Sequence, residues 1–243
     1  RNGHDDFSLI WISCIRDYWA LTGDTSLAKE VWPVIERIWD SPVWQSNSHG
    51  LWDITDNMHP YYDWGIQMSD RKGSSNLIIN LFRVGALKAT AELAKQLGKD
   101  DQPFLEQAEQ VSTAIQERLW LSESGRFAAS EEDRESPCLH GQTLALRYEV
   151  CDSEKLLATI EPELRRNFTQ GIEQGQNSGH LELYFQMYLL PALERLGRYE
   201  LAEEFILEHF AFLKTLGYPT MNECFCRAHE GKGSCCHSWS GYA

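Results

Sequence analysis

The fold is decided by one stretch of the chain, which reads GSSNLIINLFRVGALKATAELAKQLGKDDQPFLEQAEQVSTAIQERLW from residue 73 to residue 120. Apolar residues recur at helical spacing from Gly73 to Leu97 and again from Pro103 to Trp120, which predicts two helices. Between them, Gly98-Lys-Asp-Asp101 provides the glycine that commonly ends a helix. The stretch therefore predicts an antiparallel helical hairpin.

Three further pairs of helical patterns flank short turns of the same kind. They cover residues 7–21 with 25–39, 137–150 with 154–166, and 180–196 with 199–214. The turns follow one another at intervals of roughly 50 to 75 residues, which is typical of helical-hairpin repeats. No alternating strand pattern of any length is present. The sequence therefore predicts an all-α array with four clear hairpins and the start of another at Ser238.

Long polar and aromatic connections link each hairpin to the next. They cover residues 41–72, 125–136, 167–179 and 217–243. Because the tight turns lie at one end of each hairpin, these connections are expected to gather at the other end. Loops on a rigid scaffold commonly carry function, so we expect the site there.

Composition excludes some partners. With 22 Lys and Arg against 36 Asp and Glu, the 243-residue chain has a formal net charge of −14, which argues against nucleic-acid binding. No apolar run has the length of a membrane span, so no membrane partner is expected. No cofactor is expected either. The chain begins at Arg1 without a signal segment, which leaves a secreted, periplasmic or cytoplasmic location open.

The last connection holds the most concentrated set of reactive side chains. Glu223 can activate a water molecule, His237 can bind a carboxylate or a sugar hydroxyl, and Trp239 can stack on a sugar ring. A zinc site on cysteine and histidine is the alternative. Its candidate ligands are Cys224, Cys226, His229, Cys235, Cys236 and His237. Their C-x-C and C-C spacings fit structural zinc sites poorly, so no metal is expected.

A second cluster lies between Leu51 and Gly65. Asp53, Asp56 and Asp63 offer acceptors for hydroxyl groups, and the aromatic residues Trp52, Tyr61, Tyr62 and Trp64 offer stacking faces. Packing within the loop is an equally good explanation for these side chains.

Further candidates lie at the starts of helices. Asp5 and Asp6 precede the first helix, and capping that helix would account for one of them. His140 and His180 also lie near helix starts at the same end of the hairpins, where each could serve as a sugar ligand or as buried structure.

Several motifs resemble a known family. They are Phe7-Ser-Leu-Ile-Trp-Ile, Asp17-Tyr-Trp-Ala-Leu-Thr-Gly-Asp24, Tyr62-Asp-Trp-Gly65, Leu87-Lys-Ala-Thr-Ala-Glu-Leu-Ala94, the segment from Ser136 to Leu146, the segment from Leu183 to Leu193, and the most specific pair, Pro219-Thr-Met-Asn-Glu223 with Ser234-Cys-Cys-His237-Ser-Trp-Ser-Gly241. Over nearly its whole length, the chain resembles the (α/α)6-barrel catalytic domain of family 78 glycoside hydrolases, the α-L-rhamnosidases.

The resemblance implies a fold, an activity and roles for residues. The fold would be an (α/α)6 toroid, of which four to five hairpins are present, and residues 1–243 would form a single domain. The activity would be inverting hydrolysis of terminal α-L-rhamnose from rhamnosides. Glu223 would be the general base, His237 would line the sugar site, and Trp64 would contact the deoxysugar. Asp6, Asp53, Asp56, Tyr62, Asp63, His140, His180 and Trp239 complete the expected substrate-binding set.

One family motif is missing. An inverting enzyme needs a second carboxyl as general acid, and the family's Asp-x-Pro-x-Arg-x-Glu motif is not in this chain. Either the chain is a fragment of a larger multidomain protein, whose further domains would be its partners, or it is a degenerate relative of the family; we expect the fragment. Two alternatives stay open. One is another (α/α)6 enzyme, a uronide hydrolase or lyase, and the other is a non-catalytic carbohydrate-binding scaffold.

Overall fold

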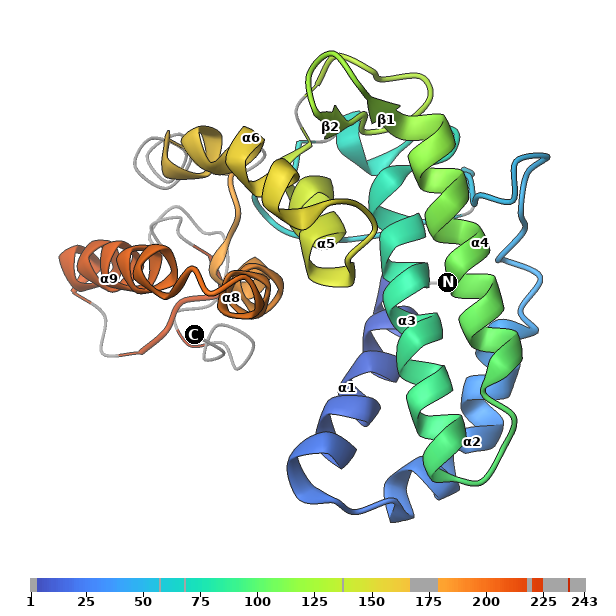
Figure 1. The fold of residues 1–243 in the computed structure, drawn as a ribbon. Helices are drawn as coiled ribbons and strands as arrows, with labels where there is room; N and C mark the ends of the chain where they lie inside the picture. The colour runs from blue at the N-terminus through green and yellow to red at the C-terminus, as the bar shows by residue number, and fades with distance from the viewer. Residues whose placement is uncertain are drawn as a thin grey trace. The chain divides into compact units, whose positions relative to one another are not determined.

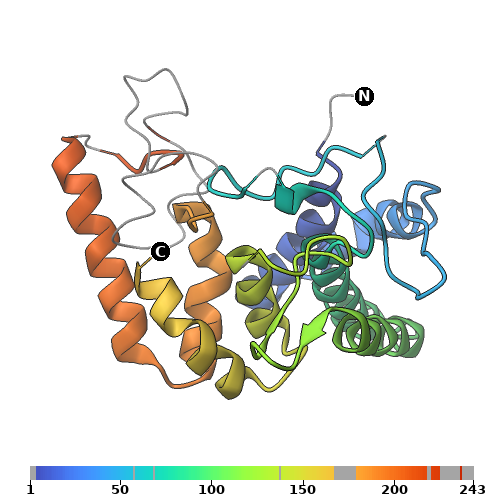
Figure 2. The ribbon, with the colours of Figure 1, turned by 90° about the horizontal axis from the view of Figure 1, so that it is seen from above.

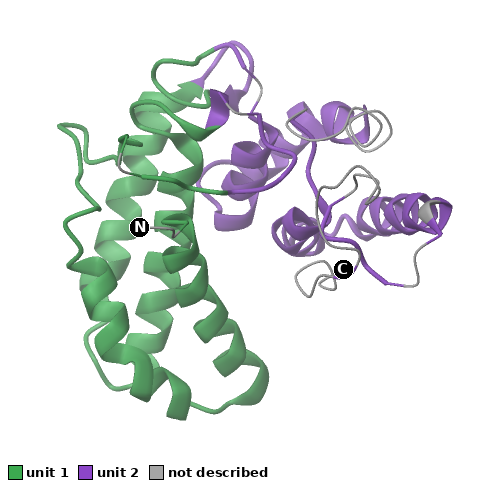
Figure 3. Ribbon diagram, turned by 180° about the vertical axis from the view of Figure 1, so that it is seen from behind, with its two compact units in different colours: residues 1–61, 71–120, 128–134 green, residues 62–70, 121–127, 135–243 purple. Residues whose placement is uncertain are grey.

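The computed structural model describes residues 4–56, 58–67, 69–136, 138–166, 179–217, 220–224 and 236. The chain divides into two compact units, shown in different colours in Figure 3. Unit 1 comprises residues 1–61, 71–120 and 128–134, and unit 2 comprises residues 62–70, 121–127 and 135–243. Each unit is described separately below.

Unit 1 is built from two helical hairpins. Its helices are α1 (Asp6–Thr22), α2 (Ser26–Trp39), α3 (Leu77–Gln96) and α4 (Gln102–Leu119). Helix α3 packs against both α1 and α4, and α1 also packs against α2. Figure 1 shows α3 and α4 side by side, joined by the short turn that the sequence predicted.

Helix α3 is the core of unit 1. Its side chains are buried on nearly every face, as expected for a helix that is apolar all round and packs on several sides. The helix begins at Leu77 because the Asn76 side chain caps it, accepting a hydrogen bond from the Ile79 N–H at 3.3 Å. The preceding residue, Ser75, has a φ of 55°, so the chain cannot continue the helix backwards. The predicted start at Gly73 was therefore four residues early.

Two polar side chains on α3 hold the connection that follows α2. Asn80 accepts from the Trp52 N–H at 2.8 Å and donates to the Trp52 carbonyl at 2.9 Å. One turn later, Arg83 donates to the Gly50 carbonyl at 2.9 Å, and its guanidinium lies 4.4 Å from the centre of the Trp52 ring. Burial lowers the pKa of Arg83 to about 10, so the side chain stays charged at neutral pH. The long connection is therefore tied to the helix rather than loose.

Unit 2 also contains two helical hairpins. They are α5 (Leu139–Tyr148) with α6 (Ser153–Arg166), and α8 (Gln186–Arg195) with α9 (Tyr199–Leu216). Helix α5 packs against α6 and α8, and α8 packs against α9; Figure 2 shows α8 and α9 side by side. A short 3-10 helix, η3 (Leu183–Phe185), leads into α8. Another, η1 (Ser69–Arg71), precedes α3 in the chain.

Two short strands interrupt the helical pattern. They are β1 (Trp120–Leu121) and β2 (Arg126–Phe127), which form a two-stranded hairpin around Gly125. The Gln142 side chain on α5 holds β2, accepting from the Phe127 N–H at 2.9 Å and donating to the Phe127 carbonyl at 2.8 Å. The sequence predicted only a loop here, because two-residue strands are too short to show alternation.

The all-α prediction is confirmed, and the described residues form the four predicted hairpins. The helix expected to begin at His180 is wrong in its first part, where the chain forms η3 before α8. The hairpin expected to start at Ser238 lies outside the described residues, and a single domain over residues 1–243 stays a prediction. None of the described helices is long and apolar enough to cross a membrane.

The burial of α3 makes a stability prediction. Leu87 is fully buried on α3, whereas Leu105 on α4 is 41% exposed. We expect Leu87→Ala to lower the free energy of unfolding by about 2–5 kcal/mol, because it leaves a cavity. The control Leu105→Ala should change it by less than about 0.5 kcal/mol. Denaturant unfolding measures both, and equal losses would contradict the central place of α3.

Candidate functional site

Trp64 and Glu223 meet in unit 2 although 159 residues separate them in the sequence. The indole N–H of Trp64 donates a hydrogen bond to Glu223 Oε1 at 3.0 Å, and both side chains are half-buried. A hydrogen bond to a carboxylate favours its charged form and restricts its orientation. The structure thus brings together the predicted general base and the predicted aromatic residue.

A buried carboxylate holds the backbone beneath Trp64. Asp63 is 1% exposed, and its Oδ1 accepts from the Trp64 N–H at 2.8 Å. Its Oδ2 lies 2.9 Å from His140 Nε2 and accepts from the Glu182 N–H at 3.0 Å. Asp63 therefore connects the chain at Trp64 with α5 and with the segment that leads into η3. It serves as an internal anchor.

The backbone conformation and close packing around Asp63 restrict which residues fit on either side of it. Tyr62 is fully buried and has a φ of 60°, a conformation that aromatic residues rarely adopt. A side-chain carbon placed on Gly65 would lie 1.9 Å from the His180 carbonyl oxygen, so only glycine fits there. The Gly65 carbonyl also accepts from the Gly179 N–H at 2.8 Å. The segment Tyr62-Asp-Trp-Gly65 thus packs closely against residues 179–180.

Two buried histidines of unit 2, His180 and His209, have pKa values that are shifted in opposite directions. Burial disfavours the charged form of His180, but its 2.9 Å hydrogen bond to Glu182 and the charges of Glu182 and Asp63 outweigh burial and raise its pKa. Burial, together with the charge of His180, lowers the pKa of His209 to about 3. His209 is therefore neutral at physiological pH, whereas His180 forms a buried ion pair when it is protonated.

Asn222 is a buried amide next to Glu223. It is 2% exposed, and neither its oxygen nor its nitrogen has a hydrogen-bond partner among the residues that the structure describes. Buried amides almost always have partners, so such a case needs an explanation. A ligand or water molecule at the site would satisfy this one.

The remaining candidates in the described part of the chain lie in unit 1, not with Glu223 in unit 2. Asp6 is fully buried and accepts from the Tyr61 N–H at 3.0 Å. Asp53 Oδ1 accepts from the Ser75 N–H at 2.6 Å and from Asn47 at 2.8 Å. Asp56 is exposed. Asp6 and Asp53 therefore have structural partners that account for them.

The prediction that an aspartate side chain caps the first helix was wrong. Asp5, the residue before α1, makes no side-chain cap hydrogen bond, because its backbone is already helical, with φ −66° and ψ −35°. Its carboxylate instead accepts from the His59 N–H at 2.8 Å. Asp5 and Asp6 both hold the loop at residues 59–61.

The C-terminal candidates are only partly described. His237 and Trp239, like most of the proposed zinc ligands, lie outside the described residues. Cys224 forms a disulfide bond and so is not available as a thiolate ligand. Within the described ranges, no group of three or more His, Cys, Asp or Glu side chains could hold a metal ion.

The sequence reasoning missed three residues near the site. Glu182 stands between buried leucines in Leu181-Glu-Leu183, and a single charge in an apolar run was the available signal. His209 lies on the buried face of α9, where it reads as an ordinary core residue. Asn222 was quoted only as the neighbour of Glu223.

The pKa of His209 predicts loss of stability in acid. Since the folded protein keeps His209 neutral, its contribution to stability is complete above about pH 6.5 and is lost as the pH falls towards 3. We expect wild type to lose up to about 1.4 kcal/mol more per pH unit in this window than His209→Leu. Unfolding free energies across pH measure the difference.

The matched control is Phe210→Leu, since Phe210 is the next residue on α9, is 42% exposed and carries no titratable group. That variant should keep the wild-type pH dependence in the same acid window. The same dependence in His209→Leu as in wild type would contradict the role of His209. The contribution of His180 to stability depends on pH in the opposite direction, because its pKa is raised in the folded protein. This contribution is complete below pH 6.5 and is lost as the pH rises through the raised pKa.

Two solved structures are similar to this chain. A family 78 rhamnosidase of Bacillus sp. GL1 superposes with a TM-score of 0.71 and 21% identity, covering 87% of this chain and 22% of that protein. A rhamnosidase from Klebsiella oxytoca with rhamnose bound superposes with a TM-score of 0.72 and 18% identity, covering 98% of this chain and 45% of that protein. The chain thus spans less than half the length of either protein. At these identities the likeness shows the fold, an all-α six-hairpin toroid that is partial here.

The sequence also matches a family model over nearly its whole length. The model is described as the bacterial alpha-L-rhamnosidase 6 hairpin glycosidase domain, and it matches residues 4–242. No curated protein matches the chain. The chain therefore belongs to the bacterial alpha-L-rhamnosidase six-hairpin glycosidase domain family and is a rhamnosidase-type glycoside hydrolase domain of family 78.

Proposed function

We propose that this domain takes part in the inverting hydrolysis of terminal α-L-rhamnose from rhamnosides, with Glu223 as the general base. The observation that carries the proposal is the hydrogen bond from Trp64 Nε1 to Glu223 Oε1 at 3.0 Å. A general base must be held at a defined place and kept charged until it takes a proton from water. An indole N–H donor favours both conditions.

The proposal extends to the residues that hold Trp64. Asp63, braced by His140 and by the Glu182 N–H, sets the backbone from which the Trp64 ring projects. We propose that Asp63 and His140 are positioning residues rather than sugar ligands, because both are fully or almost fully buried. Glu182 has the same role through His180. Asp63 is paired with His140 and Glu182 with His180, so we propose that these two carboxylates stabilise the fold while Glu223 acts as the base.

The substrate-facing part of the site is proposed from different observations. Trp64 is half-buried, so part of its ring can contact a deoxysugar while its N–H holds Glu223. The unsatisfied amide of Asn222 would hydrogen-bond a sugar hydroxyl or the attacking water. His237 and Trp239 stay proposed sugar ligands by family resemblance. We assign the general acid to no residue of this chain.

Substitution of the base tests the proposal. We expect Glu223→Gln in the complete protein to lower turnover of an α-L-rhamnoside by at least about 100-fold, because general base catalysis contributes roughly 10²–10⁴-fold. Sugar binding should be largely kept, since glutamine has nearly the same shape. Proton NMR of the first product formed by wild type should show the β anomer. Unchanged turnover in Glu223→Gln would refute the role of Glu223 as the general base. Release of the α anomer would refute inversion.

The hydrogen bond to the base has its own test. Trp64→Phe removes the indole N–H but keeps an aromatic face. We expect kcat to fall roughly 10- to 100-fold, because a hydrogen bond to a charged group contributes about 1.5–3 kcal/mol. The acid limb of the kcat profile should also move to higher pH, since the carboxylate loses a donor that favours its charged form.

A matched variant separates this effect from loss of stability. Trp39→Phe removes a comparable indole hydrogen bond, the one that Trp39 donates to Thr90 Oγ1 at 3.1 Å in unit 1. That variant should keep the wild-type acid limb. An acid limb that does not move in Trp64→Phe would show that Trp64 does not act through Glu223.

A further inference from the structure

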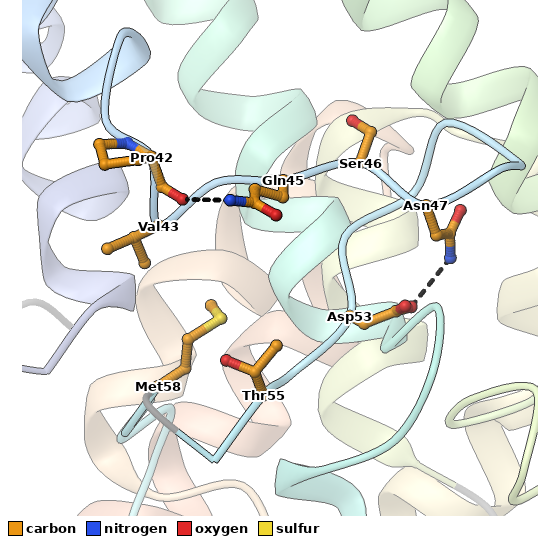
Figure 4. Close-up of a pocket in the computed structure, with 8 residues that line it drawn as sticks. All are labelled: Pro42, Val43, Gln45, Ser46, Asn47, Asp53, Thr55 and Met58. Carbon is orange, nitrogen blue, oxygen red and sulfur yellow. Dashed lines mark hydrogen bonds between the residues drawn. The ribbon is translucent and has the colours of Figure 1, made fainter.

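A half-open cavity of about 520 Å³ lies in unit 1, within the connection between α2 and α3 (Figure 4). Small-molecule sites commonly have volumes of roughly 300–1,000 Å³, so this one is large enough for a monosaccharide. The described residues that line it come from the segment between Pro42 and Met58, and all of these belong to unit 1.

The walls of the cavity are held in place before any ligand binds. Asn47 Oδ1 accepts from the His49 and Leu51 N–H groups at 2.9 and 3.2 Å, and its Nδ2 donates to Asp53 Oδ1 at 2.8 Å. Within the same segment, the Trp44 ring stacks on the Trp52 ring at 4.5 Å between ring centres. With Trp52 also bound to Asn80 and Arg83 of α3, the segment is preorganised, which lowers the entropic cost of binding.

The cavity combines an apolar end and a polar end. In Figure 4, Val43 and Met58 lie towards one end and Asn47 and Asp53 towards the other, with Gln45 between them. An apolar surface beside hydrogen-bonding groups suits a sugar ring, which has C–H faces and a hydroxyl edge. Met58 is 5% exposed, so it forms a packed wall.

The polar groups left for a ligand are mainly acceptors. Gln45 uses its amide N–H for the Pro42 carbonyl at 3.1 Å, and Asp53 uses Oδ1 for Asn47 and Ser75. Gln45 Oε1, Asp53 Oδ2 and the Thr55 hydroxyl have no hydrogen-bond partner within the part of the chain that the structure describes. A ligand there must supply donors, as sugar hydroxyls do.

The charge of the lining residues narrows the class of ligand that the cavity could bind. None of the described residues that line the cavity is Lys, Arg or His, so an anionic ligand would find no counter-charge. Asp53 is the single carboxylate among them, whereas calcium sites usually gather several oxygen ligands with more than one charge. The lining therefore favours a neutral ligand with several hydroxyl groups.

We propose that this cavity in unit 1 is a carbohydrate-binding site, which takes one neutral sugar unit. Its hydroxyls donate to Gln45, Asp53 and Thr55, and its C–H face lies on Val43 and Met58. The site goes beyond the hydrolytic role assigned to Glu223 and does not depend on it. It would let the protein hold a sugar of a longer chain or of a second molecule.

Methionine methyl NMR tests the site in the protein carrying Glu223→Gln, which prevents turnover. The chain has 4 methionines, so the spectrum is simple, and Met58→Leu and Met221→Leu assign the two signals that matter. Met58 reports on the cavity, and Met221, two residues before Glu223, reports on the candidate site. With methyl α-L-rhamnoside as the probe, we expect a saturable shift of the Met58 signal.

A matched pair of variants makes the test specific. Thr55→Trp should abolish the Met58 shift by filling the cavity, whereas Thr113→Trp, at an exposed position on α4, should leave it unchanged. Thr55→Val, which removes only the hydroxyl, should weaken the affinity about 5-fold. Calcium chloride alone should leave Met58 unmoved.

The outcomes separate this proposal from the proposed function. A Met58 signal that stays still at saturating sugar, an equal shift in Thr55→Trp, or a shift caused by calcium instead of sugar would overturn the carbohydrate site. A shift confined to the Met221 signal would also overturn the carbohydrate site in the cavity, but it would support sugar binding at the candidate site around Glu223. A shift at Met58, together with no hydrolysis of α-L-rhamnosides by the wild-type protein, would uphold the cavity site and refute the proposed function.

Discussion

The candidate site depends on one buried carboxylate. Asp63 is removed from water and would be costly to bury without partners, so its hydrogen bonds to Trp64 N–H, His140 and Glu182 N–H are obligatory. Those bonds join three separate parts of the chain in unit 2. Because Trp64 then binds Glu223, the geometry of the proposed base follows from this anchor. Loss of Asp63 would therefore be felt at Glu223 through Trp64.

In unit 1, buried neutral and cationic side chains also hold a loop in place. Its long connection is bound to α3 by Asn80 and Arg83, which reach the backbone of residues 50–52. Arg83 offsets the cost of its own burial with the Gly50 carbonyl, the Ser46 hydroxyl and the face of Trp52. In both units, polar side chains buried under a loop give that loop a defined shape. A defined shape is what a sugar site requires, since sugars are recognised by many weak hydrogen bonds.

Much of the fold was predictable, because helical periodicity depends on residues three and four positions apart. The turns at Gly23, Gly98, Gly197 and the end of α5 appear where the sequence predicted them. The errors lie where long-range contacts override local pattern. Residues 180–182 are not helical, since His180, Glu182 and Gly65 pack there. Helix α3 begins only at Leu77 because Asp53 binds the Ser75 N–H before the helix and the Asn76 side chain caps its first turn at the Ile79 N–H.

The sequence by itself determined an all-α hairpin array, a family, and Glu223 with Trp64 as residues worth examining. Only the tertiary structure decided their roles. It showed that Asp63 and His140 are internal partners and that Asp6 and Asp53 belong to unit 1. It also showed that the segment carrying Asp53 lines a cavity. The reason is physical: composition and spacing record which groups are present, but burial and pairing depend on contacts between residues far apart in the chain.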